Sequence, residues 1–123
     1  MKETILVNGG MGYIGSHTVV ELLQASYDVV IVDNLSNAEY LVYDQINKIT
    51  GQSPVFYLVD VCDTLALQEI MARHSPAVVI HFAAFKSVAG SVENPLKYFQ
   101  NNLGSLISLL QAMKVCKIKN LVF

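Results

Sequence analysis

The sequence predicts an α/β fold built around a parallel sheet, and three observations support this. Short apolar runs alternate with stretches that carry apolar residues at helical spacing. The glycine-rich segment NGGMGYIGSH (8–17) lies between the first apolar run and the first helical stretch, and Asp33 ends the second apolar run. Strands of a parallel sheet are continuously apolar because helices cover both of their faces. The alternation therefore favours a sheet whose strands are joined by helical crossovers.

Five strands are expected along the chain. They are predicted at Thr4–Asn8, Asp28–Asp33, Val55–Asp60, Ala77–Ala83 and Asn120–Phe123. Right-handed crossovers between them give a doubly wound, Rossmann-type sheet with strand order 3-2-1-4-5. A flavodoxin-like order is the alternative, and the glycine-rich loop disfavours it.

Four helices are expected between these strands. The first spans Gly12 to Ala25, and the second lies in SNAEYLVYDQINKI (36–49), before Gly51 and Pro54. In the third, Thr64 is expected to cap LALQEIMARH (65–74), and in the fourth Asn94 and Pro95 are expected to start a helix that runs to about Val115. The apolar side chains of this last helix are Leu96, Phe99, Leu103, Leu106, Leu110 and Met113.

Length and composition exclude several classes of protein. A chain of 123 residues with 53% hydrophobic residues forms a single domain, 1–123, and its net charge of −2 leaves no basic surface for nucleic acid or anionic lipid. No apolar run is long enough to span a membrane, and no signal peptide is expected. Cys62 and Cys116 are far apart, and His17, His74 and His81 lack metal-ligand spacing. We therefore expect a cytoplasmic protein with reduced thiols and no metal site.

The glycine-rich loop predicts a dinucleotide site. Gly10, Gly12 and Gly15 form G-x-G-x-x-G, and Gly9, Gly12 and Gly15 also form G-x-x-G-x-x-G. The loop follows a strand, opens a helix and precedes the acidic Asp33 by about 20 residues, which is the context of a dinucleotide fingerprint. The glycines allow a tight turn, close approach of a pyrophosphate and close helix packing. Asp33 can accept hydrogen bonds from ribose hydroxyls, which favours NAD over NADP; the alternative is a tight turn with a solvated strand end.

Other strand ends lie on the same edge of the sheet. Asp60 and Val61 follow the third strand, where an adenine could bind, although Asp60 is equally expected as a turn residue. Phe82 and Ala83 end the fourth strand, and Lys86 follows, where it could meet a phosphate or simply lie in solvent. Asn101, inside the long helix, is an ordinary polar position on this evidence.

Several segments together resemble the extended short-chain dehydrogenase/reductase family, and within it the branch of UDP-galactose 4-epimerases. They are GGMGYIGSHTVVELL, VVIVDNLSN, DVCD, VIHFAAFKSVAGSVENPLKYFQNN and KNLVF. The resemblance covers nearly the whole chain but only about the first third of such an enzyme. It implies NAD contacts beyond the glycines, at Tyr13, Ile14, Asp33, Asn34, Ser36, Asn37, Asp60, Val61, Phe82, Ala83, Lys86 and Asn101. It also implies a homodimer through the helix from residue 95 to about 115.

The resemblance also marks what this chain lacks. The family performs hydride transfer to NAD at sugar C4 with a Ser and a Tyr-x-x-x-Lys pair, and no Tyr here has Lys four residues later. We therefore expect no catalytic residue in this chain and no activity from it alone. The family usually has Thr where this chain has Asn8. A sugar-nucleotide 4,6-dehydratase or decarboxylase, or a stand-alone dinucleotide-binding regulator, are the alternative functions.

Overall fold

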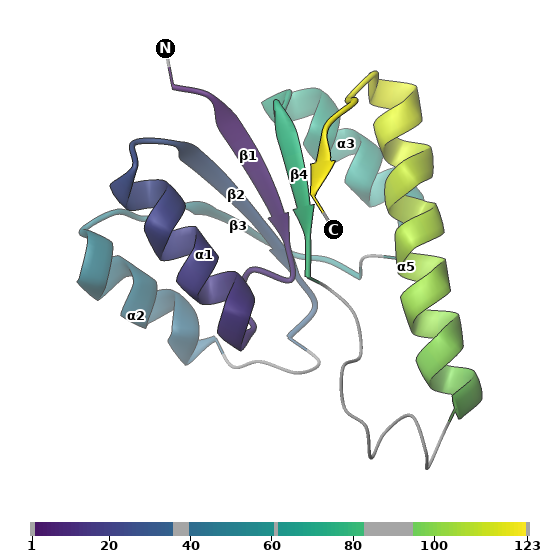
Figure 1. Ribbon diagram of the computed structural model, residues 1–123, viewed down its shortest axis with the longest axis horizontal. Helices are drawn as coiled ribbons and strands as arrows, with labels where there is room; N and C mark the ends of the chain where they lie inside the picture. The colour runs from purple at the N-terminus through teal and green to yellow at the C-terminus, as the bar shows by residue number, and fades with distance from the viewer. Residues whose placement is uncertain (1, 36–39, 61, 83–94, 123) are drawn as a thin grey trace.

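The structure is a computed structural model that describes residues 2–35, 40–60, 62–82 and 95–122, without the side chains of 97–99 and 101. Five strands form one parallel sheet with the order β3-β2-β1-β4-β5 (Figure 1). This confirms the Rossmann-type fold and the predicted strand order. The strands are β1 (Thr4–Asn8), β2 (Asp28–Asp33), β3 (Val55–Leu58), β4 (Val78–His81) and β5 (Leu121–Val122).

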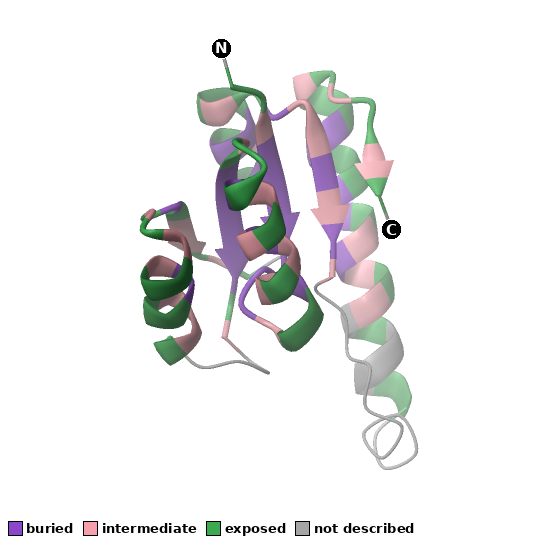
Figure 2. Ribbon diagram, turned by 60° about the vertical axis from the view of Figure 1, so that its left-hand side comes forward, coloured by how far each residue is buried: buried purple, intermediate pink, exposed green. Residues whose placement is uncertain are grey.

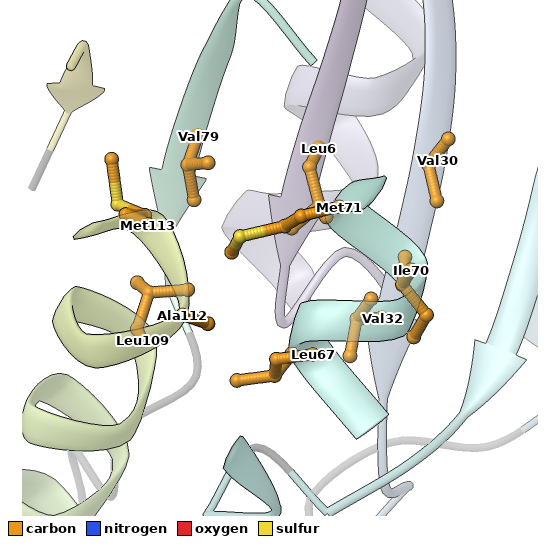
Figure 3. Close-up of a cluster of buried hydrophobic side chains, with 10 residues drawn as sticks. All are labelled: Leu6, Val30, Val32, Leu67, Ile70, Met71, Val79, Leu109, Ala112 and Met113. Carbon is orange, nitrogen blue, oxygen red and sulfur yellow. The ribbon is translucent and has the colours of Figure 1, made fainter. Parts of the chain in front are cut away.

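Helices cover both faces of the sheet. Helices α1 (Tyr13–Gln24) and α2 (Leu41–Thr50) lie on one face, and α3 (Thr64–His74) and α5 (Pro95–Cys116) lie on the other (Figure 1). Alternate residues of a strand point to opposite faces, so each strand contributes to two cores. Figure 3 shows the core under α3 and α5, where Leu6, Val32 and Val79 pack against side chains of both helices.

The second core lies under α1 and α2. Ile5, Val7 and Ile31 point to this face and pack with Val19 and Leu23 of α1 and with Ile46 of α2. The central strands are buried along most of their length (Figure 2). Burial on both faces explains why the strand segments are continuously apolar in sequence.

Several predicted boundaries differ from the observed ones. Strand β3 ends at Leu58, not Asp60, because its partner β2 ends at Asp33, the residue opposite Leu58. A single further bond, from the Val59 N–H to the Asp33 carbonyl oxygen at 3.1 Å, closes the ladder. Strand β4 is also shorter than predicted, and Ala83 lies outside the described residues. The predicted α2 start at 36–39 and the end of β5 at 123 lie outside them too.

The prediction that Thr64 caps α3 is wrong. The cap is Asp63, whose carboxylate accepts a hydrogen bond from the Ala66 N–H at 3.1 Å. The Thr64 side chain instead pairs with the hydroxyl of Ser108 on α5 at 2.9 Å. Asp63 therefore makes the capping bond that was expected of Thr64, and the Thr64 hydroxyl links α3 to α5.

Helix α5 contacts the rest of the molecule through a face that the apolar pattern did not predict. Its buried residues are Ser105, Ser108, Leu109, Ala112 and Met113. Of the predicted apolar residues, Met113 is buried, whereas Leu96, Leu103 and Leu110 are exposed; the side chain of Phe99 and the cap Asn94 lie outside the description. The buried face thus combines three small side chains with Leu109 and Met113, whereas several of the other large apolar side chains face solvent. We call Leu96, Leu103, Ile107 and Leu110 the α5 stripe. No helix of the described residues is long and apolar enough to cross a membrane.

Candidate functional site

The candidate site lies where β1, β2 and β4 end and α1 begins (Figure 1). The strand order reverses direction between β1 and β4, since β2 follows on one side and β4 on the other. In open α/β sheets, ligands bind beyond the carboxyl ends of the strands at such a reversal. The residues predicted from the glycine loop and from Asp33 meet at this edge.

The loop from Asn8 to Gly12 makes a tight turn. Gly9 has φ +84°, a left-handed conformation that residues with a Cβ rarely adopt. Its N–H donates to the Val32 carbonyl oxygen at 2.7 Å, and the Gly12 N–H donates to the Gly9 carbonyl oxygen at 3.2 Å. The turn therefore ties the end of β1 to the end of β2 and leads directly into α1.

The other three glycines of the loop differ in how closely their surroundings approach them. A Cβ at Gly15 would collide with the Gly9 carbonyl oxygen, and one at Gly10 would lie 2.9 Å from the Ile31 side chain. These two glycines allow the loop, α1 and the sheet to pack closely. Gly12 is different, because among the described residues a Cβ there would meet only the Gly9 carbonyl oxygen, at an ordinary 3.5 Å. Its φ of −74° also suits any residue. Nothing in the described part of the chain requires glycine at position 12, and the space that a Cβ would fill there is open.

The first turn of α1 faces this space with backbone amides that have no acceptor in the described part of the chain. The first intrahelical bond runs from the Ser16 N–H to the Gly12 carbonyl oxygen at 2.8 Å, so the preceding N–H groups have no helical acceptor. The N-cap residue, Gly12, has no side chain with which to cap the helix, and no acidic residue lies in its first turn. The Tyr13 and Ile14 side chains are exposed. A helix terminus with free amides and its positive dipole end is an anion site.

Asp33 is buried, with 9% of its surface exposed, and both of its carboxylate oxygens are bonded. Oδ2 accepts the Met11 N–H at 3.0 Å, and Oδ1 accepts the Leu35 N–H at 2.8 Å. The interpretation of Asp33 as a solvated strand end is therefore wrong. Its carboxylate holds the glycine loop and the loop after β2 against each other.

Asp60 is exposed and organises the turn after β3. Its Oδ1 accepts the Cys62 N–H at 2.9 Å, and its carbonyl oxygen accepts the Asp63 N–H, also at 2.9 Å. This is the turn role that the sequence left open. Partial desolvation of the thiol and, after it, the nearby negative charge of Asp60 raise the pKa of Cys62, although the residue is largely exposed. Cys62 is therefore protonated and a weak nucleophile at neutral pH.

The structure places some of the remaining predicted residues and leaves others undescribed. Phe82 follows β4, is half-buried against the core under α1 and α2, and donates its N–H to the Asn8 carbonyl oxygen at 2.7 Å. Asn34 is exposed beside Asp33. Ser36, Asn37, Val61, Ala83 and Lys86 lie outside the described residues, and Asn101 lies in α5 without a described side chain.

The sequence reasoning missed a buried polar pair at the centre of the site. The Asn8 side-chain nitrogen lies 3.1 Å from His81 Nδ1, and these residues are opposite each other in the β1–β4 register. The Asn8 Oδ1 is buried without a hydrogen-bond partner among the described residues. A polar residue at the end of each of two adjacent strands was the available signal. Met11 and Leu35 were also missed, because their roles depend on backbone amides that carry no sequence signature.

Comparison with known proteins identifies the family of this chain. The model that describes the GDP-mannose 4,6-dehydratase family matches residues 6–123. A UDP-glucose 4-epimerase of Schizosaccharomyces pombe, uge1, is 47% identical over 122 residues, which are 99% of this chain and 34% of that protein. The chain thus spans about a third of the length of the curated relatives it matches.

Solved structures agree with the fold. A UDP-glucose 4-epimerase of Stenotrophomonas maltophila, with bound NAD and formylated UDP-arabinopyranose, superposes with a TM-score of 0.96 at 45% identity. The match covers 98% of this chain and 36% of that one. The Bifidobacterium longum UDP-glucose 4-epimerase, in complex with NAD+ and UDP, gives 0.93 at 40% identity and covers 96% and 35% of the two chains. The chain therefore belongs to the GDP-mannose 4,6-dehydratase family and is similar to about one third of a UDP-glucose 4-epimerase.

Proposed function

We propose that this chain binds NAD and is the dinucleotide-binding part of an epimerase that interconverts UDP-glucose and UDP-galactose. The observation that carries the proposal is Gly12. The described residues give a packing or conformational reason for Gly9, Gly10 and Gly15 but none for Gly12, which lies beside the N-terminal amides of α1. The relatives crystallised with NAD support the same assignment.

The described residues provide two parts of an NAD site. The pyrophosphate would lie against Gly12 and accept hydrogen bonds from the backbone amides at the start of α1, at Tyr13 and Ile14. A carboxylate has about four acceptor positions, and the Met11 and Leu35 amides use two of those on Asp33. Two remain for the hydroxyls of the adenosine ribose. A 2′-phosphate would meet this negative charge, so NAD is favoured over NADP.

We assign the rest of the cofactor by the resemblance. Asn34, Ser36 and Asn37 would lie near the ribose, and Asp60 and Val61 near the adenine. The nicotinamide half would pass Phe82, Ala83, Lys86 and Asn101. Bound NAD would supply the hydride acceptor for sugar C4 and the donor that returns the hydride to the opposite face. The chain has no Tyr-x-x-x-Lys pair to move the hydroxyl proton, so we expect no turnover from these 123 residues alone.

Calorimetry on the purified chain tests the cofactor. We expect saturable binding of NAD and at least tenfold weaker binding of NADP, about 1.4 kcal/mol, because of the Asp33 charge. A folded chain, verified by circular dichroism, that does not bind NAD would contradict the proposal. The G12A variant described in the Discussion is the matched control.

Product analysis tests the reaction. A natural chain that carries this sequence together with the rest of a relative's length should interconvert UDP-glucose and UDP-galactose. The family model raises one alternative, since its description is a 4,6-dehydratase. A chain that binds NAD and releases a 4-keto-6-deoxy sugar nucleotide would support that alternative and refute the epimerase.

We also propose that the chain forms a homodimer through α5. The α5 stripe places four apolar side chains on one face of the helix, 45–67% exposed, at spacings of seven, four and three residues. Several exposed apolar side chains on one helix face are typical of an interaction site. Sedimentation velocity of wild type and of L103K/L110K tests this. We expect a dimer that the double substitution converts to monomer, with L65K on α3 as the control, since Leu65 is 72% exposed outside the stripe. A monomeric wild type would overturn the proposal.

We place the protein in the cytoplasm. Both cysteines, Cys62 and Cys116, are unpaired, and Cys62 is exposed. Exposed free thiols persist in reducing compartments.

A further inference from the structure

Leu35 has an unusual backbone conformation at the edge of the candidate site. Its φ is +60°, in the left-handed region, which a side chain with a Cβ makes unfavourable. Glycine or asparagine normally occupies such a position. Strained residues of this kind persist only where the surrounding structure holds them, and they cluster at functional sites.

The left-handed turn directs the Leu35 amide back toward the strand that precedes it. The Leu35 N–H donates to Asp33 Oδ1 at 2.8 Å, a bond that closes over only two residues. The other carboxylate oxygen is held by the Met11 N–H, from the glycine loop. One backbone amide from each of two loops thus binds a different oxygen of the Asp33 carboxylate. The bond from the Leu35 N–H depends on the left-handed conformation of Leu35.

Packing of the Leu35 side chain stabilises this backbone conformation. It is half-buried and packs against the core under α1 and α2, the same cluster that contains Met11 and Ile31. Packing of this side chain offsets the unfavourable φ. The side chain of Leu35 is therefore packed in the core while its backbone is strained, and the bond from its N–H to Asp33 depends on both.

We infer that Leu35 is a positioning residue, which fixes the Asp33 carboxylate in the orientation that binds the adenosine ribose and discriminates NAD from NADP. This inference rests on the proposed NAD site. Through its amide and its packed side chain, Leu35 would contribute to the cofactor specificity that the Asp33 carboxylate provides.

Three substitutions separate this role from simple packing. L35A removes the anchor and keeps the strain, so the turn should open and release Asp33. L35G removes the anchor and the strain together, so the turn should persist. L35M keeps an apolar anchor of similar size and should behave as the wild type. A side chain that served only to fill the core would make glycine at least as harmful as alanine, so the order of the two variants is diagnostic.

Two measurements on the purified protein test the inference. Hydrogen exchange of the amide at position 35, without nucleotide, should be slow in wild type, L35M and L35G and faster in L35A. Calorimetry should show L35A binding NAD about fivefold more weakly than L35G, the effect of about 1 kcal/mol of left-handed strain. L35A should also show a smaller preference for NAD over NADP than the wild type, which a loss of packing alone would not produce.

The outcomes separate this inference from the proposed function. If wild type binds NAD but L35G binds it no better than L35A, and the amides exchange alike, Leu35 does not position Asp33. If wild type does not bind NAD, the proposed function fails, and the exchange rates alone decide whether Leu35 holds the carboxylate.

Discussion

Replacing Gly12 with alanine tests the division of roles within the glycine loop. The substitution adds one methyl group at the position where the fold leaves space, 3.5 Å from the Gly9 carbonyl oxygen. The φ and ψ of residue 12, −74° and 175°, are those of ordinary extended backbone. Alanine can therefore adopt the native conformation, and the added methyl group projects into the space assigned to the pyrophosphate.

The expected change in stability is small, because two effects oppose each other. Alanine is a poorer N-cap than glycine, which costs about 0.5–1 kcal/mol. It also restricts the unfolded chain, which stabilises the native state by about 0.4–1 kcal/mol. The free energy of unfolding should therefore change by less than about 1 kcal/mol. The loss in NAD binding should be larger, because one methyl group forced into a filled site costs about 1–3 kcal/mol, or about 5- to 150-fold in Kd.

Gly15→Ala is the matched control, since it adds the same methyl group three residues away. There the Cβ collides with the backbone at Gly9, which cannot rotate away as a side chain could. We expect G15A to lower the free energy of unfolding by about 1–3 kcal/mol, as other overpacked sites do. Urea unfolding measures the stability of both variants, and calorimetry measures their NAD binding. If G12A bound NAD like the wild type, or lost as much stability as G15A, the assignment of Gly12 to the ligand would be wrong.

Three further predictions concern titratable side chains. D33N should lower the free energy of unfolding by about 1–3 kcal/mol without nucleotide, because one of two backbone N–H groups loses its acceptor; equal stability in urea would show that the carboxylate does not hold the loops. Burial, and next to it the charge of Arg73, lowers the pKa of His74 in the folded state. The contribution of neutral His74 to stability should therefore be complete above the unfolded pKa of about 6.5 and be lost as pH falls below it toward the lower folded pKa, and H74Q should abolish this pH dependence in urea unfolding. Cys62 has a raised pKa and should react with iodoacetamide more slowly at neutral pH than a small-molecule thiol, and more slowly still with NAD if Asp60 binds the adenine; an unchanged rate with NAD would place the adenine elsewhere.

The sequence was sufficient to predict the sheet because its signals were redundant. Continuous apolar strands indicate helices on both faces, and right-handed crossovers then leave few topologies. The glycine loop selected the order 3-2-1-4-5, which the structure confirms. Strand ends were less accurate, because the end of β3 depends on where its partner β2 stops rather than on its own residues.

Helix α5 shows where the periodicity of a single segment is insufficient. Its large apolar residues predict a buried face, but the buried face consists mostly of small ones, Ser105, Ser108 and Ala112. The choice between Asp63 and Thr64 as the cap of α3 is connected to this. The Thr64 hydroxyl bonds to Ser108 across the interface between α3 and α5. These residues are 44 apart in sequence, so a local pattern cannot predict the contact.

The sequence predicts candidate residues for the site but not the hydrogen bonds that hold them in place. The motif identified Asp33, and the structure adds that both carboxylate oxygens are already engaged by backbone amides. Amides carry no residue identity, so neither Met11 nor Leu35 could be selected from sequence. Asn8 is a partial exception, since it stands where the resemblance predicts Thr. The side-chain nitrogen of Asn8 on β1 lies 3.1 Å from His81 Nδ1 on β4, and the strand order reverses between these two strands.

The glycines of this loop show how a motif can be separated into structure and function. A glycine that the fold requires has a left-handed φ, as at Gly9, or a neighbour that a Cβ would strike, as at Gly10 and Gly15. A glycine with neither property is unexplained by the fold, because alanine there would restrict the unfolded chain at little native cost. Gly12 is in that class, and it adjoins the unpaired amides of α1. The proposed pyrophosphate site accounts for both the missing Cβ and the N–H groups without a helical acceptor, since the anion would touch the backbone between them.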